Sequence, residues 1–130
     1  AGHRDTDVNV MFNRDASTYL FSTGVINVKG STEFSDHKGL RGCWGTDWPV
    51  NDTIKYHRET VGLGVACYPH DVIEPCQDNV NNLLRLHYTA GTVLRFYLTC
   101  VAMKENNPPA NNADDFFNYL RNWQSLVLTE

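Results

Sequence analysis

The chain has 130 residues, which fits one domain, and its 42% hydrophobic and 12% aromatic residues are enough to build a packed interior. Its formal net charge of -4 and its pI near 5.7 exclude a general basic field, so nucleic acid is not an expected partner. No apolar run approaches the ~18 residues of a spanning helix, and the first residues form no signal peptide. We therefore expect a secreted chain, its export signal removed, and no membrane insertion.

Four segments of the first half read as strands. Residues 8–12 alternate apolar and polar side chains and predict a short edge strand within a polar N-terminal arm, residues 1–17. Residues 19–28 are rich in β-formers and end at a turn, and a second extended segment runs through residues 40–44. In residues 61–67 the large apolar side chains alternate with glycine or alanine. One face of that strand is almost bare, so something must pack closely against it.

The hydrophobic period then changes from two to about 3.6. A helical stripe predicts an amphipathic helix that ends before Gly91, a residue that suits a left-handed C-cap. Residues 92–103 predict a long strand, apolar on both faces. Residues 104–112 form a proline-containing loop. The stripe of the predicted helix consists of Cys76, Val80, Leu83, Leu84 and His87.

The C-terminal segment predicts a short helix and a last strand. Asn112 can cap the helix, whose first turn holds Asp114 and Asp115. Residues 124–129 read as the closing strand. The resulting order predicts a β-rich (α+β) single domain over residues 1–130, an OB-fold: a five-stranded Greek-key barrel with one main helix between strands three and four and a short helix before the last strand. The stripe of the short helix is Phe116, Leu120 and Trp123.

The cysteine pattern indicates the redox compartment. Four cysteines, Cys43, Cys67, Cys76 and Cys100, make an even count, which favours two disulfides and an extracellular protein over buried free thiols. None is in a C-x-x-C pair, and no histidine stands at recurrent zinc spacing, so no metal is expected. No cofactor motif is present, and we expect no cofactor.

Three stretches together resemble the B subunits of the subtilase cytotoxin and typhoid toxin, within the pertussis-like toxins. They are residues 20–26, an aromatic followed by serine and then Val/Ile; residues 84–97, a helix end, turn and strand with an arginine; and residues 116–121 running into 125–128. The N-terminal arm, the long segment between Trp44 and Val61 and the missing C-terminal cysteine pair depart from that family's pattern.

The resemblance implies a homopentamer that binds sialylated cell-surface glycans as part of a virulence toxin, with a catalytic A subunit as a possible partner. It also implies a disulfide between Cys43 and Cys67. Cys76 and Cys100 have no counterpart in that family and could form a second bridge peculiar to this chain. By the same resemblance, Ser22 holds sialic acid, with Thr18 and Thr23 nearby. Arg95 matches the family's strand arginine and either offers a fork to a carboxylate or balances an acidic neighbour at a subunit interface.

Two tryptophans suit stacking on a sugar. Trp44 and Trp48 lie in a loop with Asp47, Asn51 and Asp52, which could bond sugar hydroxyls, although a core role is common for tryptophan. Asn51 also begins an N-glycosylation pattern, which matters only in a eukaryotic source.

Recognition without catalysis is the expected function. The chain has no G-x-S-x-G elbow, H-E-x-x-H pair or phosphate loop, so we expect a lectin and no enzyme. A hydrolase formed by convergence of His57, His70 and a carboxylate stays open. The alternative to a lectin is a secreted OB-fold or β-barrel effector or inhibitor that binds a protein partner.

Overall fold

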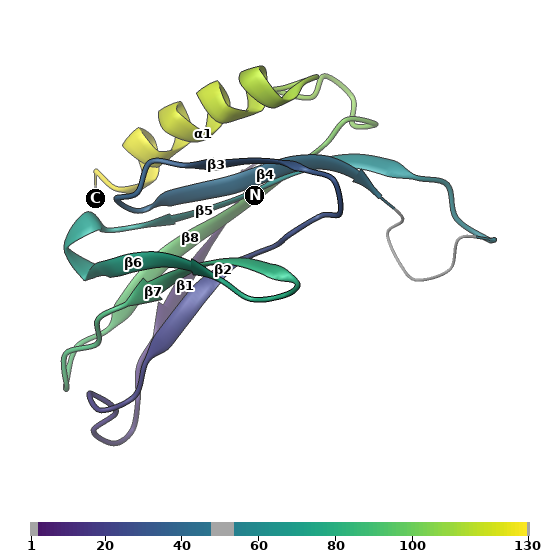
Figure 1. The fold of residues 1–130 in the computed structure, drawn as a ribbon. Coiled ribbons are helices and arrows are strands. Elements are labelled where there is room, and N and C mark those ends of the chain that lie inside the picture. Colours follow the sequence, from purple (N-terminus) through teal and green to yellow (C-terminus); the bar gives the residue numbers. More distant parts are fainter. Residues whose placement is uncertain (1–2, 48–53, 130) are drawn as a thin grey trace.

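The fold consists of two antiparallel sheets and one helix. The computed structural model describes residues 3–47 and 54–129. The helix lies on the outer face of the larger sheet, and the smaller sheet lies on its other face (Figure 1). The expectation of a β-rich α+β fold is therefore confirmed. The OB-fold barrel is wrong, because the described strands form two separate sheets.

The larger sheet has the strand order β1-β8-β5-β4-β3 and the smaller sheet the order β2-β7-β6. A one-turn helix, η1 (Pro69–Asp71), links the two sheets, and α1 (Ala113–Val127) follows the last strand. Every strand pair is antiparallel. The strands are β1 (Asp5–Val10), β2 (Phe21–Ile26), β3 (Thr32–Ser35), β4 (Leu40–Asp47), β5 (Glu59–Cys67), β6 (Val72–Gln77), β7 (Asn81–Leu86) and β8 (Leu94–Ala102).

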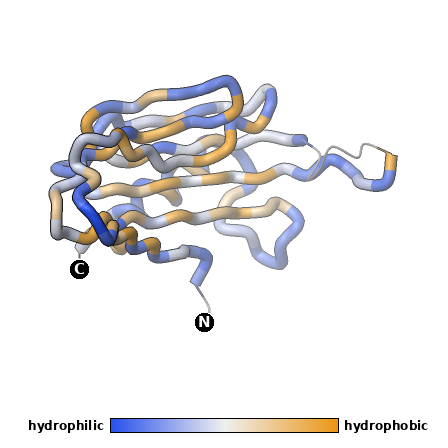
Figure 2. The backbone as a smooth tube through the Cα atoms, turned by 90° about the horizontal axis from the view of Figure 1, so that it is seen from below, coloured by the Kyte–Doolittle hydropathy of each residue, from blue (hydrophilic) through white to orange (hydrophobic). Residues whose placement is uncertain are grey.

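The bare face of β5 packs against α1. A Cβ atom added at Gly62 would lie 2.6 Å from the Phe116 ring, and one added at Gly64 would lie 2.3 Å from Leu120. Real Cβ atoms do not approach other atoms so closely, so glycine is required where the helix crosses the sheet. The prediction of a close neighbour on this face is confirmed. Figure 2 shows the hydrophobic stretches that recur along the strands, with hydrophilic residues at most turns.

The predicted helix of residues 76–87 is wrong, since β6 and β7 form a hairpin there. The Asp78 carboxylate accepts the backbone N–H groups of Val80 and Asn81 at 2.8 and 2.7 Å, which makes the turn. Beyond it, Asn82, Leu84 and Leu86 are buried in strict alternation. Their period of two, together with Pro75 in the preceding segment, outweighs the weaker helical stripe.

The C-terminal helix is longer than predicted and replaces the expected last strand. Asn112 caps α1 by accepting the N–H of Asp115 at 2.9 Å, and the helix continues to Val127. The buried stripe includes Phe116, Leu120 and Trp123, as predicted. Its contacts with β4 and β5 extend the helix over the segment that the sequence pattern assigned to a strand.

The predicted disulfides are absent, and all four cysteines are free. In the β4–β5 ladder Cys43 stands opposite Leu63, so Cys67 lies four residues further along the strand, roughly 13 Å away. A disulfide needs Cα atoms within about 7 Å. Cys76 and Cys100 lie in different sheets, on β6 and β8. Burial, joined by the Asp71 charge, raises the pKa of Cys67 to about 12, so this thiol stays protonated at neutral pH.

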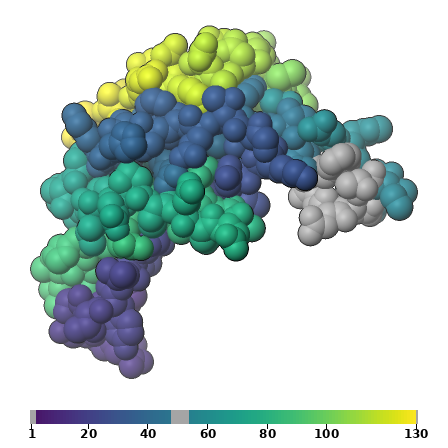
Figure 3. Space-filling model, viewed as in Figure 1, coloured from purple at the N-terminus to yellow at the C-terminus, as the bar shows by residue number. Residues whose placement is uncertain are grey.

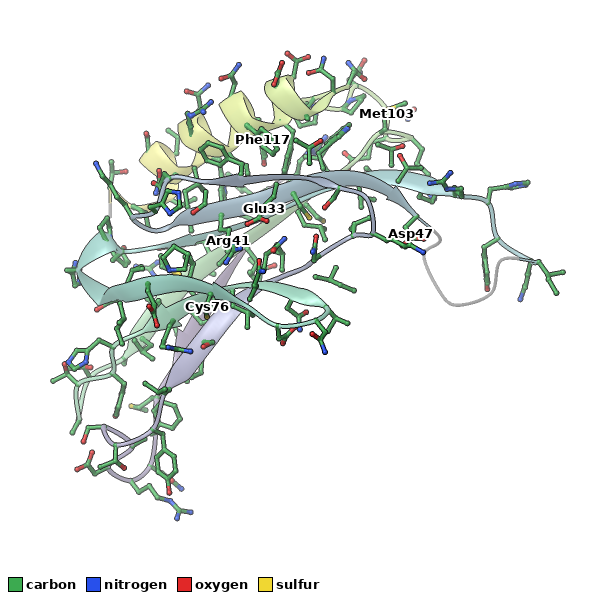
Figure 4. The ribbon with its side chains drawn as sticks, viewed as in Figure 1. Glu33, Arg41, Asp47, Cys76, Met103 and Phe117 are labelled. Atoms are coloured by element: carbon green, nitrogen blue, oxygen red, sulfur yellow. The ribbon has the colours of Figure 1, made fainter. Side chains whose placement is uncertain are left out.

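Arg41 joins the two sheets (Figure 4). Its guanidinium is buried between them, is ion-paired with Glu33 of β3, and donates to the backbone carbonyls of Cys76 and, at 2.6 Å, Leu83. It also donates to the side-chain oxygen of Asn82 at 3.3 Å. One charged side chain thus bonds groups from β3, β6 and β7, which fixes how the smaller sheet sits on the larger one.

Candidate functional site

A groove of about 910 Å³ lies between α1 and the edge of the larger sheet formed by β1 and β8. Its floor comes from the two strands and its wall from the helix. We call it the α1 groove. Its lining residues include Asp5, Asp7, Arg95, Tyr97, Asp115, Asn118, Tyr119, Asn122, Trp123 and Leu126.

Strand alternation places the acidic side chains of β1 in the groove. Asp5 stands opposite Thr99 and Asp7 opposite Tyr97, so these carboxylates share the α1 face of the sheet. Val8 and Val10 point to the other face and pack in the core between the sheets. The period-two pattern of β1 therefore separates a polar groove face from an apolar core face.

Helical spacing gathers the opposite wall. Asp115, Asn118 and Asn122 are exposed and recur three or four residues apart, which places them along one side of α1. Tyr119 and Trp123 lie beside this row, half-buried and buried. The helix therefore presents amide groups, a carboxylate and aromatic rings to the groove along one of its sides.

Arg95 and Asp7 form a closed pair on the floor. The Arg95 Nε donates to both Asp7 oxygens at 3.1 and 3.2 Å, and Nη2 donates to Oδ2 at 2.7 Å. These bonds lower the pKa of the Asp7 carboxyl and raise the pKa of Arg95. The guanidinium also lies 5.2 Å from the centroid of the Tyr97 ring.

The remaining charges make the groove acidic. Arg4 is ion-paired with Glu105 at 2.7 Å, and Arg95 with Asp7. Asp5 lies 3.8 Å from the His3 ring nitrogen Nδ1, and Asp115 accepts from the Asn112 amide at 2.9 Å. Both arginines thus face a carboxylate of the same chain, which disfavours an anionic ligand.

The aromatic residues are held firmly at the base of the groove. The Tyr119 hydroxyl bonds to the Thr99 hydroxyl at 3.0 Å. Burial, joined by the Tyr68 hydroxyl, raises the pKa of Tyr97 to about 12. The buried Nε1–H of Trp123 has no hydrogen-bond partner among the described residues. An unsatisfied buried donor is costly, so an acceptor that reached this indole would be favourable.

The structure spreads the sequence-predicted site residues apart. Arg95 lies in the α1 groove, whereas Ser22 and Thr23 lie on β2 in the other sheet, and Thr18 is exposed in the preceding turn. Trp44 is buried in the core with its ring centroid 5.6 Å from that of Phe116. Trp48, with Asn51 and Asp52, lies outside the described residues.

The convergence of His57 and His70, which the sequence left open, does not occur. His57 precedes the nine-residue strand β5 and His70 follows it, which places them roughly 30 Å apart. Among residues 3–47 and 54–129, no three His, Cys, Asp or Glu side chains cluster to hold a metal ion. No helix in this part of the chain is long and apolar enough to cross a membrane.

Most groove residues were missed at the level of sequence, although two signals were present. Residues 5–9 alternate Asp or Asn with Thr or Val, and the amides at 118 and 122 follow Asp115 at helical spacing. Each pattern is typical of an ordinary solvent-exposed face. The two segments come together only because β1 pairs with β8, a contact between the two ends of the chain.

The chain belongs to the family described as a domain of unknown function (DUF4861), which its residues 1–128 match. No curated protein and no solved structure matches it. These comparisons add nothing to the resemblance to toxin B subunits, so any function has to be argued from the groove itself.

Proposed function

We propose that this domain binds a glycan in the α1 groove. The observation behind the proposal is the combination of side chains along one groove: aromatic rings on the wall and floor, with carboxylates and amides between them. Aromatic rings stack on the apolar faces of sugars, and carboxylate and amide groups hydrogen-bond their hydroxyls in both directions. A groove of about 910 Å³ has room for more than one sugar unit.

The charges favour an uncharged glycan. An acidic sugar such as sialic acid would need a cation with donors to spare, and both groove arginines are engaged by carboxylates of the chain. The sialoglycan specificity, pentamer and toxin membership expected from sequence came from the resemblance to toxin B subunits, and secretion came from the cysteine count. Of these expectations we retain glycan recognition, and the test compares sialylated with unsialylated glycans.

A glycan array with paired sialylated and unsialylated termini tests the proposal. We expect hits among uncharged glycans, with titration calorimetry giving weak, saturable binding to one site per chain. Asn122→Ala should weaken binding by about 1 kcal/mol, roughly fivefold, by removing one amide partner. Asn106→Ala is the matched control, because Asn106 is an exposed asparagine outside the groove. No glycan hit, or equal loss in both variants, would reject the assignment.

A further inference from the structure

The smaller sheet covers only part of the larger one. At one end, Val65, Phe96 and Arg41 are buried beneath β6, β7 and the start of β2. At the other end, apolar side chains on the same face of β5 and β8 keep solvent contact; they are Val61, Leu63, Leu98, Cys100 and Ala102. We call these five residues the open face.

Strand β2 borders the open face. Its first residue, Phe21, packs against Phe96 of β8, with ring centroids 6.2 Å apart. Its last residue, Ile26, accepts the Cys43 thiol of β4 at 3.4 Å. Strand β2 therefore crosses the larger sheet from β8 to β4, with β7 on one side and the open face towards the other.

The outer edge of β2 has unpaired backbone groups. Asn27 N–H bonds to Val80 O at 2.8 Å, which marks one hydrogen-bonded pair of the β2–β7 ladder. Because such pairs alternate along an antiparallel ladder, Ser22 and Gly24 direct their N–H and C=O groups away from β7. No described residue bonds to these outward groups. They are spaced as an additional strand requires.

This edge lacks the features that protect the other three. Strand β1 has Asp5 and Asp7, β3 is four residues long and contains Glu33, and β6 has Glu74, Pro75 and a register irregularity. Strand β2 has no charge, no proline and no bulge. Natural proteins protect solvent-exposed edges with such features, so their absence at β2 indicates an edge that pairs with a further strand.

A hollow of about 630 Å³ lies at the end of β2, lined by Ile26 and the turn that follows it. Figure 3 shows the molecule hollowed beneath the larger sheet. Ile26 and Val80 on its rim are 56% and 58% exposed. The remaining wall includes Val28, Val61 and Leu63.

We propose that β2 receives an extended polypeptide strand of a partner protein, with apolar side chains at alternate positions, that also covers the open face. Its backbone bonds Ser22 and Gly24, and its apolar alternate side chains rest on Leu63 and Leu98. A polypeptide strand is the occupant because it alone presents N–H and C=O groups at the repeat of the edge and apolar groups on one face. This surface lies on the opposite side of the larger sheet from the α1 groove and is independent of glycan binding.

The test uses a synthetic peptide of alternating valine and threonine with lysine at both ends. Cys100, the exposed thiol of the open face, reports occupancy through its alkylation rate, measured by mass spectrometry. We expect the peptide to slow Cys100 alkylation at least threefold and saturably, and to slow amide hydrogen exchange at Ser22 and Gly24. The same peptide N-methylated at every residue should do neither.

Two variants separate edge pairing from apolar adsorption. Ser22→Pro removes an outward N–H while leaving the β2–β7 ladder intact, and should abolish protection; Ser22→Ala keeps the N–H and should retain it. Protection by the N-methylated peptide, or unchanged protection in Ser22→Pro, would overturn the proposal, and so would no protection in the wild type. If Ser22→Pro fails to fold, the comparison of the unmodified and the N-methylated peptide on the wild-type protein still tests the proposal. Cys100 protection that rises with protein concentration alone would assign the edge to a second copy and contradict the proposal.

Discussion

A single carboxylate, that of Asp36, fixes the turn between β3 and β4. Its Oδ1 accepts the backbone N–H groups of Lys38, Gly39 and Leu40 at 2.8 to 2.9 Å, and its Oδ2 accepts Gln124 of α1 at 3.4 Å. Burial raises the pKa of this carboxyl, but the donors together outweigh burial and the net shift is downward. The Asp36 carboxylate thus bonds both the turn and the C-terminal half of α1.

Asp36→Ala should destabilise the domain by about 2 kcal/mol, because several backbone donors lose their acceptor. Asp36→Asn keeps an acceptor oxygen and should cost less. A carboxyl whose folded pKa is lowered stabilises above its unfolded pKa, and the contribution is lost as the pH falls through the folded pKa. Wild-type stability should therefore decline below about pH 4 more steeply than that of Asp36→Asn in urea titrations. Equal pH slopes would contradict the assignment.

Of the candidate site, the sequence located Arg95 alone. Its interpretation as a partner of an acidic neighbour agrees with the Asp7 pair, but Asp7 lies in the same chain, 88 residues away in sequence, and not across a subunit interface. Asp115 and Trp123 were recognised as helix residues but not as a binding surface. Their contribution to the groove depends on where β1 lies, which no local pattern specifies.

At the scale of elements, the contact of α1 with the sheet was the most predictable feature. The Gly and Ala alternation of β5 implied a close neighbour, and the stripe of α1 supplies it through Phe116 and Leu120. The sequence did not predict that the two belong together, because a bare strand face can accept any flat partner.

Gly64→Ala should cost about 1–3 kcal/mol, since its Cβ would lie 2.3 Å from Leu120. Leu120→Ala should cost about 2–5 kcal/mol by leaving a cavity. The double variant should cost clearly less than the sum, because the added methyl enters the vacated space. Chemical denaturation of the four proteins measures this coupling, and additive effects would show that the two residues do not meet.

The β6–β7 hairpin shows where periodicity misleads. Leu83 and Leu84 fit both a helical stripe and a strand, and only the alternation of Asn82, Leu84 and Leu86 is satisfied by burial. Asn82 is buried although its side chain is polar. Its side-chain oxygen accepts Arg41, a partner 41 residues away that the hairpin sequence alone cannot reveal.

At the scale of the whole molecule, the arrangement of the two sheets depends on Arg41. β-Rich content and five of the eight strands, β1, β2, β4, β5 and β8, were predictable in part from local patterns. The split into two sheets was not, because it is set by long-range bonds from one buried guanidinium to β3, β6 and β7. Nothing in the local sequence, between Leu40 and Gly42, distinguishes this arginine from any other.

Arg41→Met should destabilise the domain by about 3–5 kcal/mol, because it leaves Glu33 and two backbone carbonyls without their donor. Lys104→Met is the matched control, since Lys104 pairs with Glu59 at the surface, and it should cost under about 1 kcal/mol. Thermal unfolding followed by circular dichroism compares them. Similar small losses in both variants would mean that Arg41 does not hold the sheets together.

Glycan binding in the α1 groove is most directly tested through the indole of Trp123. Two-dimensional ¹H–¹⁵N NMR follows the indole N–H signals of the tryptophans during titration with uncharged trisaccharides and with sialyllactose, and Trp123→Phe assigns the Trp123 signal. We predict that an uncharged trisaccharide shifts the Trp123 signal saturably, while that of Trp44, buried in the core, stays in place. A Trp123 signal that no glycan moves, or that moves only with sialyllactose, would contradict the account.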